Sequence, residues 1–167
     1  MPRIFQCRRN GGAERIQWPT HSPPRGGADD TKKNPRTMPA KRPLAVFIAD
    51  DSEPVAEMLR ELITEPGRIE VVGMAESQDT AIADIRRLKP DVVVLDLQLK
   101  TGSGTDVIRA VRASNELRDT RVIVISNHTA PQLKAGCLEL GANGYFDKVK
   151  ELPDLATELR RLADASR

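Results

Sequence analysis

The stretch PDVVVLDLQLK, residues 90–100, decides the fold. Its Val and Leu residues form a run of the length of a buried strand, and the run ends on a carboxylate, Asp96, before the chain turns into a loop. A strand that is apolar on both sides is typical of a parallel sheet covered on both faces. A buried strand needs no acid at its end. Asp96 is therefore either a solvated loop residue or a group that the fold brings to a site of chemistry.

Composition divides the 167 residues into two parts. Residues 1–43 hold seven of the 12 prolines and 10 Lys/Arg against 3 Asp/Glu, whereas residues 44–167 carry a net charge of −5. The first part is too poor in aliphatic residues to offset the entropy of ordering, so we predict a disordered basic tail over 1–43 and a folded domain over 44–167. We also expect Met38, rather than Met1, to be the native start.

Several classes of protein do not fit this sequence. No run approaches the roughly 18 apolar residues of a membrane span, and the arginines near the N-terminus precede no apolar segment of a secretory signal. Cys7 and Cys137 lie far apart and offer neither a disulfide framework nor zinc-ligand spacing. The acidic folded part gives no electrostatic footprint for DNA. We therefore expect a cytoplasmic protein that binds neither membranes nor DNA directly.

From residue 44 onward, short apolar runs alternate with amphipathic segments. In the segment 54–63, for example, Val55, Met58, Leu59, Leu62 and Ile63 recur at helical spacing and are predicted to face the core. This alternation predicts an α/β fold, (βα)₅, with a doubly wound five-stranded parallel sheet. The predicted strands are 44–50, 70–77, 91–97, 121–126 and 144–148, and the predicted helices are 54–63, 79–89, 104–114, 131–141 and 152–165.

Polar side chains end four of the predicted strands. The ligand site of an open parallel sheet lies outside the carboxyl ends of its strands, so these side chains should gather at one edge. Each alone has a plain explanation, such as a turn or helix cap, and their joint placement favours a site. Glu76 ends a strand predicted at the sheet edge and is less telling. The gathered residues are Asp50, Asp51, Asp96, Ser126 and Lys148.

The chemistry of this set points to phosphoryl transfer. Neighbouring carboxylates repel one another unless a cation intervenes, and Mg²⁺ prefers carboxylate oxygens, water and phosphate oxygens. Lys148 adds a positive charge suited to a phosphoryl group, and Ser126 adds a hydroxyl donor. A carboxylate nucleophile, Mg²⁺, an ammonium group and a hydroxyl together form a phosphoryl-transfer site.

Four motifs in the same order resemble the receiver domain of bacterial two-component response regulators. They are VFIADD, VVVLDLQLKTGSG, VIVIS and GANGYFDK, and the resemblance covers about residues 44–165. It implies a flavodoxin-like fold in which Asp96 is phosphorylated and Lys148 pairs with the phosphoryl group. It also implies Mg²⁺ ligands: the side chains of Asp51 and Asp96, Asp50 directly or through water, and the backbone carbonyl of Gln98.

The resemblance further implies a switch and a set of partners. Ser126 would donate to the phosphoryl group and Tyr145 would turn inward with it, so that the face formed by 131–141, 144–148 and 152–165 signals to a downstream protein. The phosphoryl donor would be a sensor histidine kinase or a histidine phosphotransfer protein. Two positions depart from the family pattern, because Lys100 and Val149 stand where proline is common. We expect a looser loop at Lys100 and a changed loop geometry after Lys148.

Only about 20 residues follow Lys148, which predicts a stand-alone receiver in a phosphorelay, a phosphoacceptor protein rather than an enzyme. Three alternatives remain open. A Mg²⁺-dependent phosphohydrolase of the haloacid dehalogenase type also uses an aspartate at a strand end, but it usually carries a second Asp where this chain has Gln98. A receiver-like adaptor would bind partners without phosphorylation. A fragment of a larger DNA-binding or hybrid protein would continue into an output domain.

Overall fold

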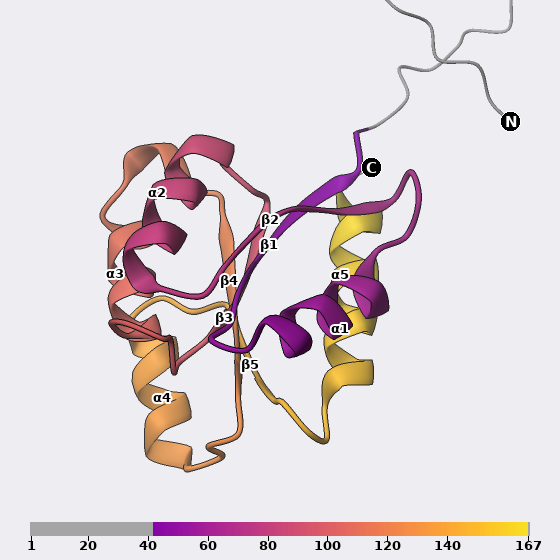
Figure 1. Ribbon diagram of the computed structural model, residues 1–167. Coiled ribbons are helices and arrows are strands. Elements are labelled where there is room, and N and C mark those ends of the chain that lie inside the picture. The colour runs from indigo at the N-terminus through magenta and orange to yellow at the C-terminus, as the bar shows by residue number, and fades with distance from the viewer. Residues whose placement is uncertain (1–41, 167) are drawn as a thin grey trace, which may run out of the picture. The chain divides into compact units, whose positions relative to one another are not determined.

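Five strands alternate with five α-helices in the computed structural model, which describes residues 42–166 (Figure 1). These elements occur in the predicted order, and their ends lie within two residues of the predicted ends. The strands are β1 (Leu44–Ala49), β2 (Ile69–Ala75), β3 (Val92–Asp96), β4 (Arg121–Ser126) and β5 (Gly144–Asp147). The helices are α1 (Glu53–Ile63), α2 (Gln78–Leu88), α3 (Gly104–Arg112), α4 (Pro131–Glu139) and α5 (Leu152–Ala165), with a 3₁₀ turn at Asn115–Leu117.

The predicted tail falls almost wholly outside the described residues, and so does the choice between Met1 and Met38 as the start. Arg42, which the prediction assigned to the tail, is described. Its guanidinium group forms a two-pronged ion pair with the carboxylate of Asp91, at 2.8 and 2.7 Å. The described fold therefore includes Arg42 as well as the predicted domain.

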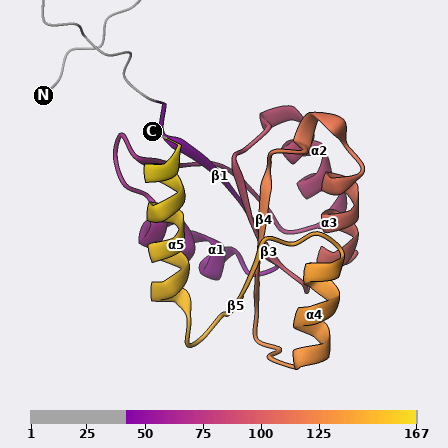
Figure 2. The same ribbon diagram turned by 180° about the vertical axis from the view of Figure 1, so that it is seen from behind.

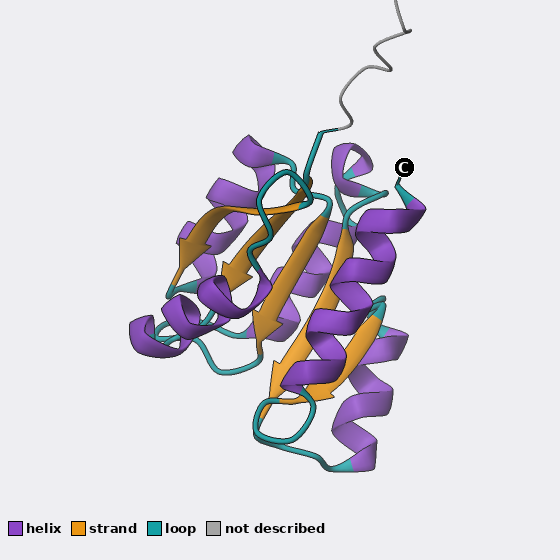
Figure 3. Cartoon of the chain, turned by 90° about the vertical axis from the view of Figure 1, so that its right-hand side faces the viewer, coloured by secondary structure: helices purple, strands orange, loops and turns teal. Residues whose placement is uncertain are grey.

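The strand order is β2-β1-β3-β4-β5, and every neighbouring pair is parallel, as the common direction of the arrows in Figure 3 shows. From β1 the chain moves outward to β2 on one side and then returns to place β3, β4 and β5 on the other. The connections of β1 and β3 thus lead in opposite directions, which makes their carboxyl ends the topological switch point of the sheet. The flavodoxin-like fold predicted from the sequence is confirmed.

Helices cover both faces of the sheet (Figures 1 and 2). Helices α1 and α5 lie over one face, and α2, α3 and α4 lie over the other. Along β1, Val46 and Ile48 pack beneath α1 and α5, whereas Phe47 and Ala49 pack beneath the other three helices. Strand β3 is buried along its whole length. Burial on both faces explains why the stretch that follows Pro90 is apolar without alternation.

Helix α1 contacts the core with fewer apolar residues than predicted. Ala56, Leu59 and Ile63 are buried, but Met58 is 46% exposed and Leu62 is 40% exposed. The three buried residues form one narrow stripe at the spacing of a helix face. The prediction that Met58 and Leu62 face the core is wrong, because the neighbouring elements cover only this stripe and the two side chains lie beside it.

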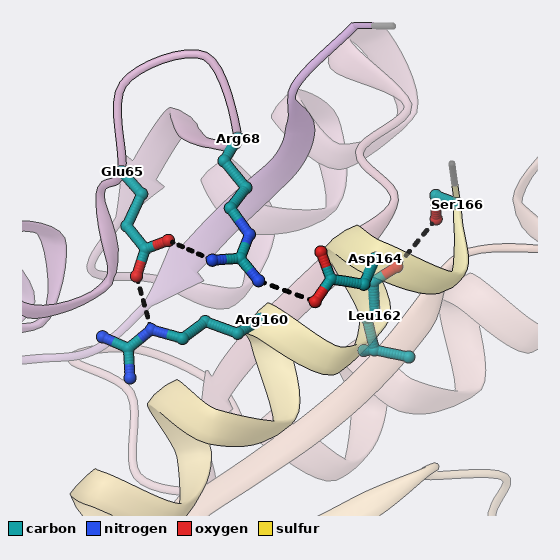
Figure 4. Close-up of polar contacts among 6 residues, drawn as sticks. All are labelled: Glu65, Arg68, Arg160, Leu162, Asp164 and Ser166. Carbon is teal, nitrogen blue, oxygen red and sulfur yellow. Dashed lines mark hydrogen bonds and ion pairs between the residues drawn. The ribbon is translucent and has the colours of Figure 1, made fainter.

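A chain of ion pairs joins the loop before β2 to α5 (Figure 4). Arg68 contacts Glu65 at 3.2 Å and Asp164 at 2.7 Å, and Arg160 contacts the second carboxylate oxygen of Glu65. All four side chains are partly exposed, so each pair contributes at most about 1 kcal/mol. Because Arg68 immediately precedes β2, this network joins the C-terminal part of α5 to the amino end of β2.

No helix in the described part of the chain is long and apolar enough to cross a membrane. The longest, α5, has 14 residues and an exposed charged side. A membrane-spanning helix needs about 20 predominantly apolar residues.

Helix α3 begins directly against the end of β3, and this close approach requires glycine at position 104. The N–H of Gly104 donates to the carbonyl oxygen of Leu97 at 3.0 Å. A Cβ atom at Gly104 would lie 2.4 Å from the backbone oxygen of Asp96. Gly136 in α4 differs, because a Cβ atom there would meet nothing within 4 Å.

We expect Gly104→Ala to lower the free energy of unfolding by about 1–3 kcal/mol, because the backbone next to Asp96 has to move. Gly136→Ala is the matched control and should raise that free energy by about 0.5–1 kcal/mol, as alanine does inside a helix. Urea unfolding followed by circular dichroism measures both changes. Wild-type stability in Gly104→Ala would contradict the close approach of α3 to β3.

Candidate functional site

Three acidic side chains gather at the carboxyl ends of β1 and β3, the strands that flank the switch point. Ala49 of β1 pairs with Leu95 of β3, so the next residues, Asp50 and Asp96, are neighbours in register. One carboxylate oxygen from each of Asp50, Asp51 and Asp96 lies within 4.8 Å of the others. Asp50 and Asp96 are buried and Asp51 is exposed. We call these three residues the acidic cluster; the sequence predicted it.

The ammonium group of Lys148 lies between the two buried carboxylates of the acidic cluster. Its Nζ is 2.6 Å from Oδ2 of Asp50 and 2.7 Å from Oδ2 of Asp96. Lys148 follows β5, and its backbone N–H donates to the carbonyl oxygen of Ser126 at 3.0 Å, which ties this turn to the end of β4. The lysine side chain is only 9% exposed. The fold thus delivers Lys148 to the acids, as predicted.

Burial and ion pairing shift the pKa values of Asp50 and Lys148. Burial raises the pKa of Asp50 above its usual range, although the Lys148 ammonium and the N–H of Ser52 oppose the shift. For Lys148, burial acts to lower the pKa, but its close contacts with the carboxylates of Asp50 and Asp96 outweigh burial and raise it. Lys148 therefore stays protonated at neutral pH. One cation among three acids leaves an excess of negative charge, which favours a divalent cation.

The acidic cluster fits a small, hard cation. Oδ1 of Asp50 and Oδ1 of Asp96 each accept the backbone N–H of the residue two positions later, at 3.0 and 3.2 Å, so both side chains are oriented. Oδ2 of Asp50 is buried and, although Lys148 lies beside it as an ion pair, forms no hydrogen bond of favourable geometry among the described residues. The carbonyl oxygen of Gln98 takes part in no described hydrogen bond either. These oxygens and Asp51 are ligands that Mg²⁺ accepts.

The loop after Asp96 is tied to the end of β2. The N–H of Lys100 donates to the carbonyl oxygen of Glu76 at 2.8 Å, and Nζ of Lys100 contacts Oε2 of Glu76 at 2.8 Å. The side chain of Gln78 accepts the N–H of Ser103 at 2.8 Å. The expectation of a looser loop than one with proline stays a prediction; a proline at position 100 would lack the N–H that makes the first contact. Glu76, which the sequence analysis set aside, helps to hold this loop.

Ser126 and Tyr145 both form hydrogen bonds with the backbone of His128. The Oγ of Ser126 accepts the N–H of His128 at 3.1 Å, and the hydroxyl of Tyr145 donates to the carbonyl oxygen of the same residue. Ser126 is 1% exposed and Tyr145 is 7% exposed, so the tyrosine ring is turned inward. No hydrogen bond joins Ser126 Oγ to Asp96 or Lys148 among the described residues. The structure therefore brings Ser126 to the edge of the site, with its hydroxyl engaged elsewhere.

Two acids on either side of Lys148 were missed by the sequence analysis. Asp147 and Glu151 both form hydrogen bonds with backbone groups of the turn after β5. The sequence did contain a signal for Asp147, because an aspartate at the start of a loop commonly accepts a hydrogen bond from a backbone N–H nearby. Aspartates at the start of loops are so frequent that the sequence alone does not show which of them supports a functional site.

Comparison with known proteins identifies one family. The family model of the response regulator receiver domain matches residues 46–160. A protein-glutamate methylesterase/protein-glutamine glutaminase of Bacillus subtilis is 34% identical over 107 residues, 63% of this chain and 29% of the relative. The DNA-binding transcriptional activator DevR/DosR of Mycobacterium tuberculosis is 32% identical over 103 residues, 62% of this chain and 46% of the relative.

A solved structure agrees with these matches. The signal receiver domain of the response regulator NarL from Mycobacterium tuberculosis superimposes with a TM-score of 0.66 and 29% identity, covering 74% of this chain and 98% of that one. The chain spans less than half the length of the two curated relatives. The family match runs from within β1 to within α5 and includes every residue of the acidic cluster and Lys148. This chain belongs to the response regulator receiver domain family.

Proposed function

We propose that this receiver domain accepts a phosphoryl group on Asp96 from the phosphohistidine of a sensor histidine kinase or a histidine phosphotransfer protein. One observation carries the proposal: Nζ of Lys148 lies 2.7 Å from Oδ2 of Asp96, beside two further carboxylates. A carboxylate nucleophile, an ammonium group and a site for a divalent cation are the components of phosphoryl transfer to an acid.

In the proposed reaction, a carboxylate oxygen of Asp96 attacks phosphorus. A P–O bond forms while the bond between phosphorus and the imidazole nitrogen of the donor breaks, and the electron pair of that bond stays on the nitrogen. The ammonium of Lys148 then pairs with a phosphoryl oxygen and keeps its contact with Asp50. Mg²⁺, bound by the acidic cluster and the carbonyl of Gln98, would supply positive charge for the equatorial phosphoryl oxygens.

Ser126 and Tyr145 are the proposed switch. The hydroxyl of Ser126 would turn to a phosphoryl oxygen and give up the N–H of His128, which lies 3.1 Å from it in this structure. The same residue carries the carbonyl oxygen that accepts the Tyr145 hydroxyl. Movement of this loop would therefore reach the tyrosine and alter the face formed by α4, β5 and α5, which we propose as the surface for a downstream protein.

This proposal concerns the receiver part that the relatives share. The methylesterase and DNA-binding names belong to those proteins, and the stand-alone, non-enzymatic character expected from the sequence stays a prediction, testable by the mass and gene context of the native protein. No described feature favours the phosphohydrolase. The side chain two positions after Asp96 is the amide of Gln98, which has no acidic proton to give to a leaving group.

We expect acetyl phosphate with Mg²⁺ to add one phosphoryl group to the wild-type protein, seen by intact mass spectrometry. Asp96→Ala should take up none, because the nucleophile is gone. Lys148→Ala should react about 10²-fold more slowly, since one charge-stabilising donor is lost. Lys134→Ala, on the exposed side of α4, is the control and should react at the wild-type rate. An undiminished adduct in Asp96→Ala would remove the central assignment.

Affinity for Mg²⁺ should fall as the pH is lowered below neutral, because the pKa of Asp50 is raised and a proton therefore competes with the cation at higher pH than at an ordinary carboxylate. Titration calorimetry at several pH values measures this. Asp50→Asn should weaken binding and remove that part of the pH dependence. Asp119→Asn, whose side chain is 93% exposed, should bind like the wild type. Affinity independent of pH in the wild type would contradict a role for Asp50.

A further inference from the structure

Hydrogen bonds from two flanking acids hold the turn that carries Lys148. Oδ1 of Asp147 accepts the N–H groups of Val149 and Lys150, at 2.8 and 3.0 Å. Oε2 of Glu151 accepts the N–H of Asp147 at 2.7 Å, and the N–H of Glu151 donates to the carbonyl oxygen of Asp147 at 3.0 Å. Lys148 lies inside both hydrogen-bonded rings, so its backbone is enclosed on each side.

The contribution of position 149 comes from its backbone. The Val149 side chain is in solvent, because the residue is 77% exposed, whereas its N–H makes the shorter of the two bonds to Asp147. A residue without that N–H would leave Asp147 with a single donor. The turn therefore depends on an acceptor at position 147 and on a donor at position 149.

The charge of Asp147 strengthens this arrangement. The N–H groups of Val149 and Lys150 lower the pKa of the Asp147 carboxyl below its usual range, so it is ionised at neutral pH. Hydrogen bonds to an ionised acceptor are shorter and stronger than those between neutral groups. The position of this backbone matters because a lysine side chain is long and loses much rotamer freedom when it is fixed.

We propose that Asp147 and Glu151 are positioning residues for phosphoryl transfer: through hydrogen bonds to the turn they fix the backbone of Lys148 so that its ammonium group meets Asp50 and Asp96. This inference rests on the proposed function of Lys148. Neither acid contacts the phosphoryl site, so each acts through the lysine.

The test compares variants that remove or keep the acceptor oxygens. Asp147→Ala should slow phosphorylation by acetyl phosphate by at least about tenfold, since small displacements of a catalytic group cost large factors in rate. Asp147→Asn keeps an acceptor oxygen but loses the charge, so it should react faster than Asp147→Ala and more slowly than the wild type. Glu151→Ala and Glu151→Gln form a second pair with the same expected contrast. Asp154→Ala removes an exposed acid from the first turn of α5 and should leave the rate unchanged.

A double variant separates positioning from general destabilisation. In the Lys148→Ala background, Asp147→Ala should cause no further slowing, because the group it positions is absent. An equal slowing by Asp147→Ala with and without Lys148, or a wild-type rate in the single variant, would overturn the proposal.

A crystal structure of Asp147→Ala decides the positioning without any phosphorylation. We expect Nζ of Lys148 to leave ion-pair distance of at least one of Asp50 and Asp96, which lie 2.6 and 2.7 Å away in the wild type. Unchanged contacts would count against the positioning role. Failure of the wild type to form the adduct would instead count against the proposed function alone.

Discussion

A buried ammonium group between two buried carboxylates is the interaction on which the site depends. Asp50 is fully buried, and Lys148 and Asp96 are nearly so, so none of these charges would be tolerated there without the others. A pair of this kind is weak evidence for stability, because desolvation offsets most of the attraction. Burial raises the pKa of Asp50, because the folded chain holds this carboxylate where its charge is disfavoured, and a bound cation would relieve that cost.

The two-sided burial of the sheet explains why this interaction lies where it does. Helices cover both faces, so the strands offer polar groups only at their ends. At the amino ends, the ion pairs of Arg68 hold α5 in place. At the carboxyl ends, the opposite connections of β1 and β3 leave room for Asp50, Asp51 and Asp96. Ion pairs thus lie at the amino ends of the strands, whereas the candidate site lies at their carboxyl ends.

Both loops beside the acidic cluster are held by backbone N–H groups that a proline would lack. Lys100 donates to Glu76, and Val149 donates to Asp147. In each case an acidic residue next to the loop completes the contact, by an ion pair with Lys100 or by the carboxylate of Asp147 itself. In this chain, backbone N–H groups at positions 100 and 149 therefore help to hold the loops of the site.

The sequence by itself determined the order and type of the strands and helices, because hydrophobic periodicity is a local property of the chain. It also determined which polar groups meet, since parallel strands bring their carboxyl ends to one edge. Tertiary structure alone decided that Met58 lies beside the buried stripe of α1, that Ser126 Oγ accepts from His128, and that Glu76 and Asp147 hold the loops of the site. These outcomes depend on how closely particular side chains and backbone groups approach once the chain has folded, and neither residue type nor spacing encodes such distances.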